Sequence, residues 1–129
     1  MTENVVTTMS DICDPEVDTV AFVRGMFGRL GEKWSIRALD ELDHGPLRFT
    51  ALMTALPGIS HRILTVTLKT LESDGLVSRT SYPETPPRVE YALTKLGKEF
   101  LDQTSAMVDW LQGHQEQIEA SRAGRLGTE

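Results

Sequence analysis

The side chains best suited to chemistry gather on one short amphipathic stretch, residues 60–73. With about 100° of rotation per residue, Leu64, Leu68 and Leu71 fall on one face, which predicts a helix that buries this stripe. The opposite face carries Arg62, Thr65, Val66, Lys69 and Ser73. Basic and hydroxyl groups on one helix face suit hydrogen bonds to base edges and phosphates in the major groove of DNA, although a solvated helix face is the alternative.

Four of these outward side chains have distinct candidate roles. Arg62 can pair with guanine through two hydrogen bonds or clamp a phosphate, and Thr65 can donate to a base or a phosphate. Val66 is an apolar side chain that faces water without a folding reason, and it suits contact with a thymine methyl group. Lys69 lies further along the helix, where contact with the DNA backbone is the more natural role.

The start and the end of this helix are both marked by turn signals. Ser60 follows Pro57-Gly58 and is a good N-cap residue, a role that competes with base contact. His61 sits on the flank of the helix, where contact with a base or phosphate and an inert surface position both remain open. Asp74-Gly75 is predicted to end the helix.

A β-hairpin is predicted directly after this helix. Residues 76–82 and 89–93 read as two strands on either side of a turn rich in proline, residues 83–87, which is too stiff to be helical. A basic helix followed at once by a hairpin is the arrangement with which a winged helix-turn-helix meets DNA.

Two arginines occupy the predicted hairpin. Arg79 and Arg88 lie on the facing strands near the turn, and the preceding prolines stiffen the backbone at Arg88. A rigidly presented arginine suits a narrow minor groove, where the negative potential is enhanced. The alternative for Arg88 is a surface ion pair with Glu84 or Glu90, which contributes little to stability.

Further helices are predicted around this unit, and the fold class is mainly α with a small β-hairpin wing (α+β), a winged helix-turn-helix. A flexible N-terminal arm over residues 1–13 precedes the domain, residues 14–119, and a disordered C-terminal tail follows over residues 120–129. The remaining helices are expected at Pro15–Leu30 with Asp14 as N-cap, Lys33–Leu42, Phe49–Leu56, and from the cap Thr94 to about Ile118.

The first and last helices are expected to dimerise. The first carries apolar side chains on two sides, so it needs two surfaces to bury against, its own domain and a partner chain. The last is long and amphipathic. A hydrophobic ligand pocket between these two helices, lined by Phe27 and Trp110, is an alternative, although both side chains are more simply explained as dimer core.

Size and charge limit the class of protein. A chain of 129 residues supports one domain, and its net charge is −6 with a pI near 5.0. Acidic residues collect at both ends, whereas residues 19–98 are mildly basic, which permits DNA binding without demanding it. The chain has no apolar run long enough to span a bilayer and no signal-peptide pattern, so we expect a cytoplasmic protein without a membrane partner.

Enzymatic and metal sites are not predicted. The sequence contains no Ser-His-Asp set, Gly-rich phosphate loop or HExxH motif, so we expect neither an enzyme nor a cofactor. The soft metal ligands are scattered along the chain, as His44, His61, His114 and Cys13. A winged helix used only for protein–protein contact is the alternative to a DNA-binding protein, and the acidic balance keeps it open.

Four sequence segments follow one another in a fixed order and spacing. They are Leu30-Gly31-Glu32-Lys33-Trp34, Gly45-Pro46-Leu47-Arg48-Phe49, Leu56-Pro57-Gly58-Ile59-Ser60 with Arg62, Leu64, Thr65, Leu68 and Leu71, and Pro86-Pro87-Arg88-Val89-Glu90-Tyr91 with Leu93-Thr94 and Gly97. Together they resemble the HxlR-type bacterial transcriptional regulators, a MarR-like winged helix-turn-helix family. The resemblance implies a homodimer that represses transcription from a pseudo-palindromic operator. It places residues 60–74 in the major groove and the wing, residues 76–93, at the minor groove.

The resemblance also adds a residue at the start of the second helix. Lys33 stands there as a candidate DNA contact. Glu32 departs from the small residue common in the family, and a carboxylate beside Lys33 weakens phosphate affinity.

Some members of the family sense oxidants or electrophiles through a cysteine just before the first helix, and Cys13 sits at that place. A thiol beside a helix N-terminus has a lowered pKa and is more reactive, but Asp11, Asp14 and Glu16 oppose that effect. Redox sensing through Cys13, with a small electrophile or oxidant as effector, is therefore one hypothesis. An inert thiol, in a regulator that responds to a small ligand, is the other.

Overall fold

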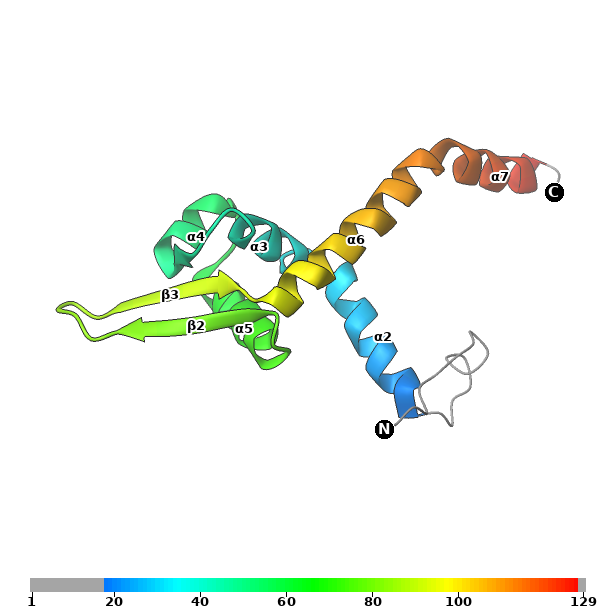
Figure 1. The fold of residues 1–129 in the computed structure, drawn as a ribbon. Coiled ribbons are helices and arrows are strands. Elements are labelled where there is room, and N and C mark those ends of the chain that lie inside the picture. The colour runs from blue at the N-terminus through cyan, green and yellow to red at the C-terminus, as the bar shows by residue number, and fades with distance from the viewer. Residues whose placement is uncertain (1–17, 128–129) are drawn as a thin grey trace.

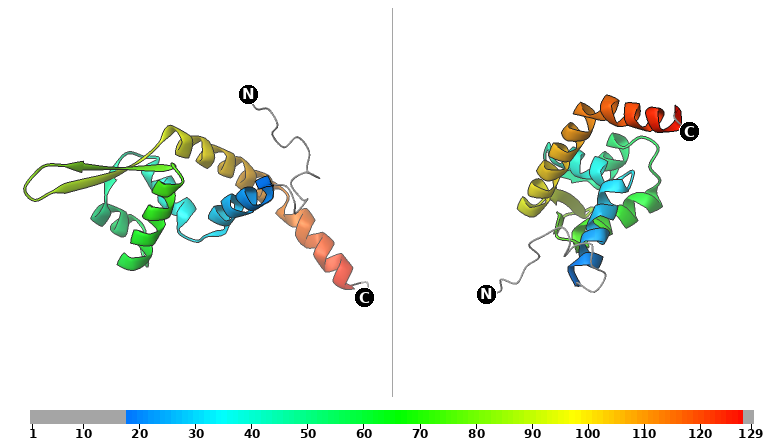
Figure 2. Two further views of the ribbon diagram at one scale, coloured as in Figure 1. Left: turned by 90° about the horizontal axis from the view of Figure 1, so that it is seen from below. Right: turned by 90° about the vertical axis from the view of Figure 1, so that its right-hand side faces the viewer.

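The computed structural model describes residues 18–127, and Figure 1 shows their arrangement. A compact body lies at the centre, a β-hairpin projects from one side of it, and the terminal helices extend away on the other side (Figures 1 and 2). In chain order the elements are α2 (Asp18–Gly31), α3 (Ser35–Leu42), β1 (Leu47–Arg48), α4 (Phe49–Ala55), α5 (His61–Ser73), β2 (Val77–Tyr82), β3 (Arg88–Leu93), α6 (Lys95–Gly113) and α7 (Gln115–Gly127).

The core of the body is built almost entirely from leucines. The predicted stripe of Leu64, Leu68 and Leu71 on α5 is buried, which confirms the helical periodicity read from the sequence. Side chains from α3, α4, the loop before α5, the start of β2 and the first half of α6 complete the cluster: Ala38, Leu39, Leu42, Leu52, Leu56, Ile59, Leu76, Val77 and Leu101.

The sheet has three antiparallel strands in the order β1-β3-β2. The hairpin pairs Val77 with Leu93 at its base and Tyr82 with Arg88 near its tip. The short strand β1 pairs Leu47 with Tyr91 on the other edge of β3, and it was absent from the sequence prediction. We call the projecting hairpin, residues 77–93, the wing.

Local capping chemistry sets both ends of α5 as predicted. The Ser60 hydroxyl accepts a hydrogen bond from the Ile63 amide at 3.0 Å. At the other end Gly75 adopts φ 79°, and the amides of Gly75 and Leu76 donate to the carbonyls of Glu72 and Leu71. This left-handed glycine turn satisfies the last helical carbonyls and directs the chain into β2.

The start of α6 is docked closely onto the turn between α5 and β2. Thr94 caps α6 by accepting from the Gly97 amide at 2.9 Å, while its own hydroxyl donates to the Gly75 carbonyl at 2.7 Å. A Cβ atom on Gly97 would overlap the Leu76 carbonyl and lie 2.9 Å from Leu93 Cδ1. Only glycine therefore fits where α6 meets the base of the wing.

Two predicted helix boundaries differ from the structure by more than one residue, and one lies outside the described residues. The second helix begins at Ser35 rather than Lys33. The helix α6 ends at Gly113, and α7 extends from Gln115 to Gly127, which corrects the expected disordered tail for residues 120–127. The predicted N-terminal arm and the cap Asp14 lie outside the described residues. Within residues 18–127, no helix combines the length and the apolar character needed to cross a membrane.

Candidate nucleic-acid interface

The outward face of α5 is displayed on a helix whose opposite face is anchored in the core. Arg62, Val66, Lys69 and Ser73 are all exposed, and Val66 keeps 55% of its surface accessible. The structure thus exposes together four of the five side chains that the sequence assigned to one face, whereas Thr65 is half-buried. We call these four residues the outer face of α5.

Three residues near the start of α5 have partners within the protein. Ser60 acts as the N-cap, the role that competes with base contact. Thr65 donates its hydroxyl hydrogen to the His61 carbonyl at 2.9 Å. Its oxygen can therefore accept a hydrogen bond from DNA, but its hydrogen is not free to donate one. The His61 ring lies 4.6 Å from the Phe49 ring, which holds it on the flank of the helix.

A shallow notch separates α5 from the turn before α3. Its volume is about 240 Å³, and it lies between Glu32, Lys33 and Trp34 on one side and Ile63 and Val66 on the other. Lys33 is exposed, and its ammonium lies 5.0 Å from the centre of the Trp34 ring. The Lys33 position is therefore beside the outer face of α5, as a shared DNA surface requires.

This turn and the first residues of α3 contain two features that sequence reasoning did not assign. The guanidinium of Arg37 lies 4.8 Å from the Trp34 ring centre, so Arg37 adds a second exposed cation beside Lys33. Its four-residue separation from Lys33 was the signal that could have found it, because the sequence prediction placed both residues on one helix. The carboxylate of Glu32 accepts a hydrogen bond from the Ser35 hydroxyl, which directs the carboxylate toward α3.

The register of the wing places its two arginines on opposite faces. Arg79 pairs with Tyr91, on the face that Val77 and Leu93 use to pack into the core. Arg88 pairs with Tyr82 on the other face. Because side chains alternate along a strand, Arg79 and Arg88 cannot converge on one phosphate, although the facing strands were correctly predicted.

Arg88 is held inside the wing by three neighbours. Its guanidinium lies 3.1 Å from the Glu84 carboxylate, 3.8 Å from the Glu90 carboxylate and 4.1 Å from the centre of the Tyr82 ring. Its Nε is buried without a hydrogen-bond partner. The ion pair named as the alternative from sequence is thus present, whereas Arg79 is exposed and takes part in no ion pair within residues 18–127.

Arg48 is a further basic residue of the sheet. It is exposed, and β1 places it opposite Glu90, on the face that also bears Arg88. Sequence reasoning missed this position because a two-residue strand has no periodicity that could reveal it.

An ion pair joins the end of α5 to α2. Arg29 Nε donates to Asp74 Oδ2 at 2.6 Å, and the two side chains keep 24% and 19% of their surface exposed. The hydrogen bond to Asp74 raises the pKa of Arg29 above its ordinary value. This contact links the helix with the candidate DNA surface to the first described helix of the chain.

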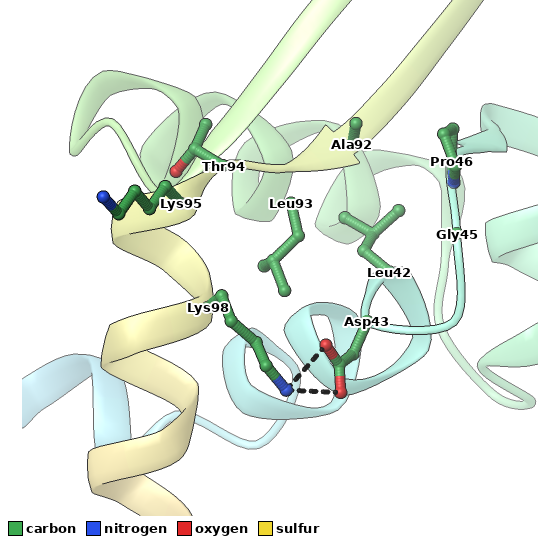
Figure 3. A pocket seen from close by; sticks show the side chains of 9 residues that line it. All are labelled: Leu42, Asp43, Gly45, Pro46, Ala92, Leu93, Thr94, Lys95 and Lys98. Carbon is green, nitrogen blue, oxygen red and sulfur yellow. Dashed lines mark hydrogen bonds and ion pairs between the residues drawn. The ribbon is translucent and has the colours of Figure 1, made fainter.

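A surface hollow of about 330 Å³ lies between the end of α3, the end of β3 and the start of α6 (Figure 3). Its one internal ion pair joins Lys98 Nζ to Asp43 at 3.1 Å. Hydrogen bonds to Asp43 and Asp102 raise the pKa of Lys98 above its ordinary value. The hollow offers no group that the candidate DNA surface uses.

A larger apolar groove runs between α2 and α6. Its main part has a volume of about 730 Å³ and is lined by Phe22, Met26, Leu96 and Phe100 among others. Phe27 lines an adjoining part, as the sequence hypothesis of a pocket expected, whereas Trp110 stacks on His114 with ring centres 4.2 Å apart.

Within residues 18–127 no group of three or more His, Cys, Asp or Glu side chains is arranged to hold a metal ion. Cys13 lies outside the described residues.

Comparison with known proteins identifies the group to which this geometry belongs. Residues 29–119 match the HxlR-like helix-turn-helix family. An uncharacterized HTH-type transcriptional regulator of Methanothermobacter thermautotrophicus is 46% identical over 81 residues, which span 63% of this chain and 62% of that relative, less than two thirds of its length.

Solved structures have the same fold. A transcriptional regulator of the MarR family from Enterococcus faecalis V583 has a TM-score of 0.68 and 36% identity, with 93% of this chain and 99% of that chain covered. The reduced form of the transcriptional regulator YodB from Bacillus subtilis has a TM-score of 0.62 and 32% identity, covering 76% of this chain and 90% of that one. YodB has also been solved after treatment with diamide.

Proposed function

The chain belongs to the HxlR-like helix-turn-helix family of transcriptional regulators, and from this premise we propose that it binds double-stranded DNA as a homodimer and represses transcription. In this proposal the outer face of α5 enters the major groove of each half of a pseudo-palindromic operator. The wing lies over the adjacent minor groove and offers Arg79 and Arg88 as candidate contacts.

The outer face of α5 is the observation that carries this proposal. An exposed Arg62, an exposed Val66 and an exposed Lys69 stand on a helix that is capped and anchored before any partner arrives. A preorganised helix loses little conformational freedom on binding, so its contacts contribute fully to affinity. Lys33 and Arg37 lie beside this surface and add positive charge where a DNA backbone would pass.

Exposed apolar side chains on the terminal helices support the homodimer. Phe22 and Phe27 on α2 are 67% and 61% exposed, and α6 exposes a further set. That set is Leu96, Met107, Val108, Trp110 and Leu111. Apolar surface of this extent is characteristic of an interface, and burial against a second copy would remove it from water.

Selection of duplexes from a random pool by the full-length protein, followed by affinity measurements over a salt series, tests the proposal. We expect one enriched pseudo-palindromic sequence and an affinity that falls steeply as salt rises, because phosphate contacts release counterions. A protein that enriches no duplex and shows no salt-dependent binding would be a protein–protein interaction module instead, the alternative that the acidic balance keeps open.

We propose that the effector is an oxidant or a small electrophile and that it reacts with the thiol of Cys13. The family resemblance and the two solved states of the YodB relative support a thiol-based response to oxidants or electrophiles. With one cysteine in the chain, oxidation would yield a sulfenic acid, a mixed disulfide or a bridge between the two protomers. The groove between α2 and α6 supports a second candidate, a regulator that responds to a small apolar ligand without thiol chemistry.

Treatment with diamide separates these two candidates. If Cys13 is the sensor, diamide abolishes operator binding by the wild-type protein and leaves the Cys13→Ser variant unaffected. Equal binding by both proteins before and after diamide would remove the thiol mechanism and favour the ligand-responsive one.

A further inference from the structure

We propose that Arg79 is the arginine with which the wing contacts DNA, and that Arg88 is a positioning residue that holds the wing tip in shape. This inference rests on the proposed DNA-binding function and assigns different tasks to two residues of the same hairpin. Three observations carry it: the faces on which the two side chains lie, the partners they already have, and the position of α5 relative to the sheet.

The sheet face that bears Arg79 is the face turned toward α5. Val77 and Leu93 on that face pack into the core against the leucines of α5, and Arg79 follows two residues beyond Val77. In Figure 2 the hairpin extends past α4 and α5, which both lie on one side of it. DNA bound to the outer face of α5 lies beyond α5 on that same side, so Arg79 projects toward it.

Arg88 has the contacts of a structural residue. It lies on the opposite sheet face, and its guanidinium is bracketed by Glu84 and Glu90 while it covers the Tyr82 ring. Transfer of Arg88 to a DNA groove would break both ion pairs and the ring contact. It would also leave two carboxylates unpaired close to the DNA backbone, which repels them.

The same contacts explain how Arg88 shapes the wing. Tyr82 ends β2 and Arg88 begins β3, so their contact closes the hairpin at the last pair before the turn. Glu84 lies within the turn, and its ion pair ties the turn back to the strand. A closed tip fixes the direction of both strands, and this keeps Arg79 at a constant position relative to α5.

The test compares Arg79→Ala, Arg88→Ala and Tyr82→Leu in the full-length protein, with Arg122→Ala on α7 as a matched loss of one exposed positive charge. Affinity for the duplex selected from the random pool, and for a random duplex of 30 base pairs, is measured over a salt series. Amide hydrogen exchange of residues 77–93 in the free protein reports the order of the wing. Tyr82→Leu removes the ring contact without changing the charge.

For Arg79→Ala we expect an affinity about tenfold lower and normal hydrogen exchange in the wing. The slope of log affinity against log salt should fall by about 0.9 for each protomer that loses a contact. Arg88→Ala and Tyr82→Leu should both accelerate exchange in the wing and weaken binding with the wild-type salt slope. Arg122→Ala should match the wild type in all three measurements.

Two results would overturn the assignment while leaving the proposed function intact. One is a reduced salt slope for Arg88→Ala together with an unchanged slope for Arg79→Ala. The other is tighter binding by Tyr82→Leu, which would identify Arg88 as a DNA contact restrained by its neighbours. If the wild-type protein binds neither duplex in a salt-dependent way, the proposed function fails and this assignment fails with it.

Discussion

The body of the protein buries its apolar side chains within itself, whereas the terminal helices leave several of theirs exposed to water. Leu39, Leu52 and Leu64 in the body have no exposed surface, and each end of α5 is capped within the chain. Phe22 and Phe27 on α2 and Trp110 on α6 leave more than half of their surface in water. We call α2 and the part of α6 beyond Leu101 the outer arms. The difference teaches that the body stabilises itself, while the outer arms need another surface to bury their apolar side chains.

Truncation of a core leucine should produce the largest effect, and it should depend on the body alone. Leu39→Ala removes a fully buried side chain at the centre of α3, so we expect a loss of about 4 kcal/mol in unfolding free energy from lost burial and the cavity. Urea denaturation followed by circular dichroism measures it at two protein concentrations. A loss that varied strongly with concentration would contradict the self-contained body.

An added methyl group at the joint between body and arm should have the next largest effect. Gly97→Ala places a Cβ atom against the Leu76 carbonyl, and we expect a loss of about 3 kcal/mol because the neighbour is backbone and cannot rotate away. Thermal and urea denaturation measure it. Gly124→Ala on α7 is the matched control, since its Cβ would meet no atom within 4 Å and it should be neutral or slightly stabilising.

Removal of the exposed rings should affect association and leave the body folded. For the double variant Phe22→Ala with Phe27→Ala we expect the homodimer to weaken by about 2 kcal/mol, as for interface residues of central importance. Sedimentation velocity over a concentration series measures it, and the circular dichroism of the monomer should be unchanged. Val66→Ala is the control, because this exposed apolar side chain belongs to α5 and should leave association unaltered.

Loss of one cation from the outer face of α5 should weaken DNA binding. It should change neither the stability of the body nor the association of the outer arms. Arg62→Ala should weaken binding to the selected duplex by about 1–3 kcal/mol and relax the base preference at one position of each half-site. Fluorescence anisotropy with single-base variants of the duplex measures both quantities. An affinity equal to that of the wild type would remove Arg62 from the recognition surface.

The smallest effect should come from the ion pair that links the two regions. Asp74→Asn removes the charge that pairs with Arg29, and we expect a loss of at most about 1 kcal/mol in unfolding free energy, since both groups retain contact with solvent. Hydrogen exchange of α2 should accelerate while that of α3 stays constant. Equal exchange in both helices would show that this pair does not hold α2 against the body.

Features that depend on neighbouring residues were predictable from the sequence. The bounds of α5 follow from Ser60 at one end and Gly75 at the other, because a cap and a left-handed turn are local chemistry. The buried leucines and the exposed Val66 on α5 follow from helical periodicity in the same way.

Features that depend on distant partners were not predictable. Strand β1 exists because Leu47 and Arg48 pair with Tyr91 and Glu90, more than forty positions along the chain. The opposite faces of Arg79 and Arg88 follow from the hairpin register, which the turn composition alone does not determine. The missed extent of α7 is of another kind, because the glutamine, glutamate and alanine of this segment favour a helix locally.

The contact between Gly97 and Leu76 also sets a limit on the DNA that the proposed dimer can accept. The base of the wing, the end of α5 and the start of α6 meet at this one joint, where two hydrogen bonds of Thr94 and a contact too close for any Cβ at Gly97 hold them together. If the proposed dimer keeps this joint unchanged in both protomers, the protein itself sets the distance between its two α5 helices. One base pair added between half-sites turns one of them by on the order of 35° relative to the other, and a rigid joint cannot follow that rotation. We therefore expect such a dimer to discriminate operators by the spacing of their half-sites as well as by their bases.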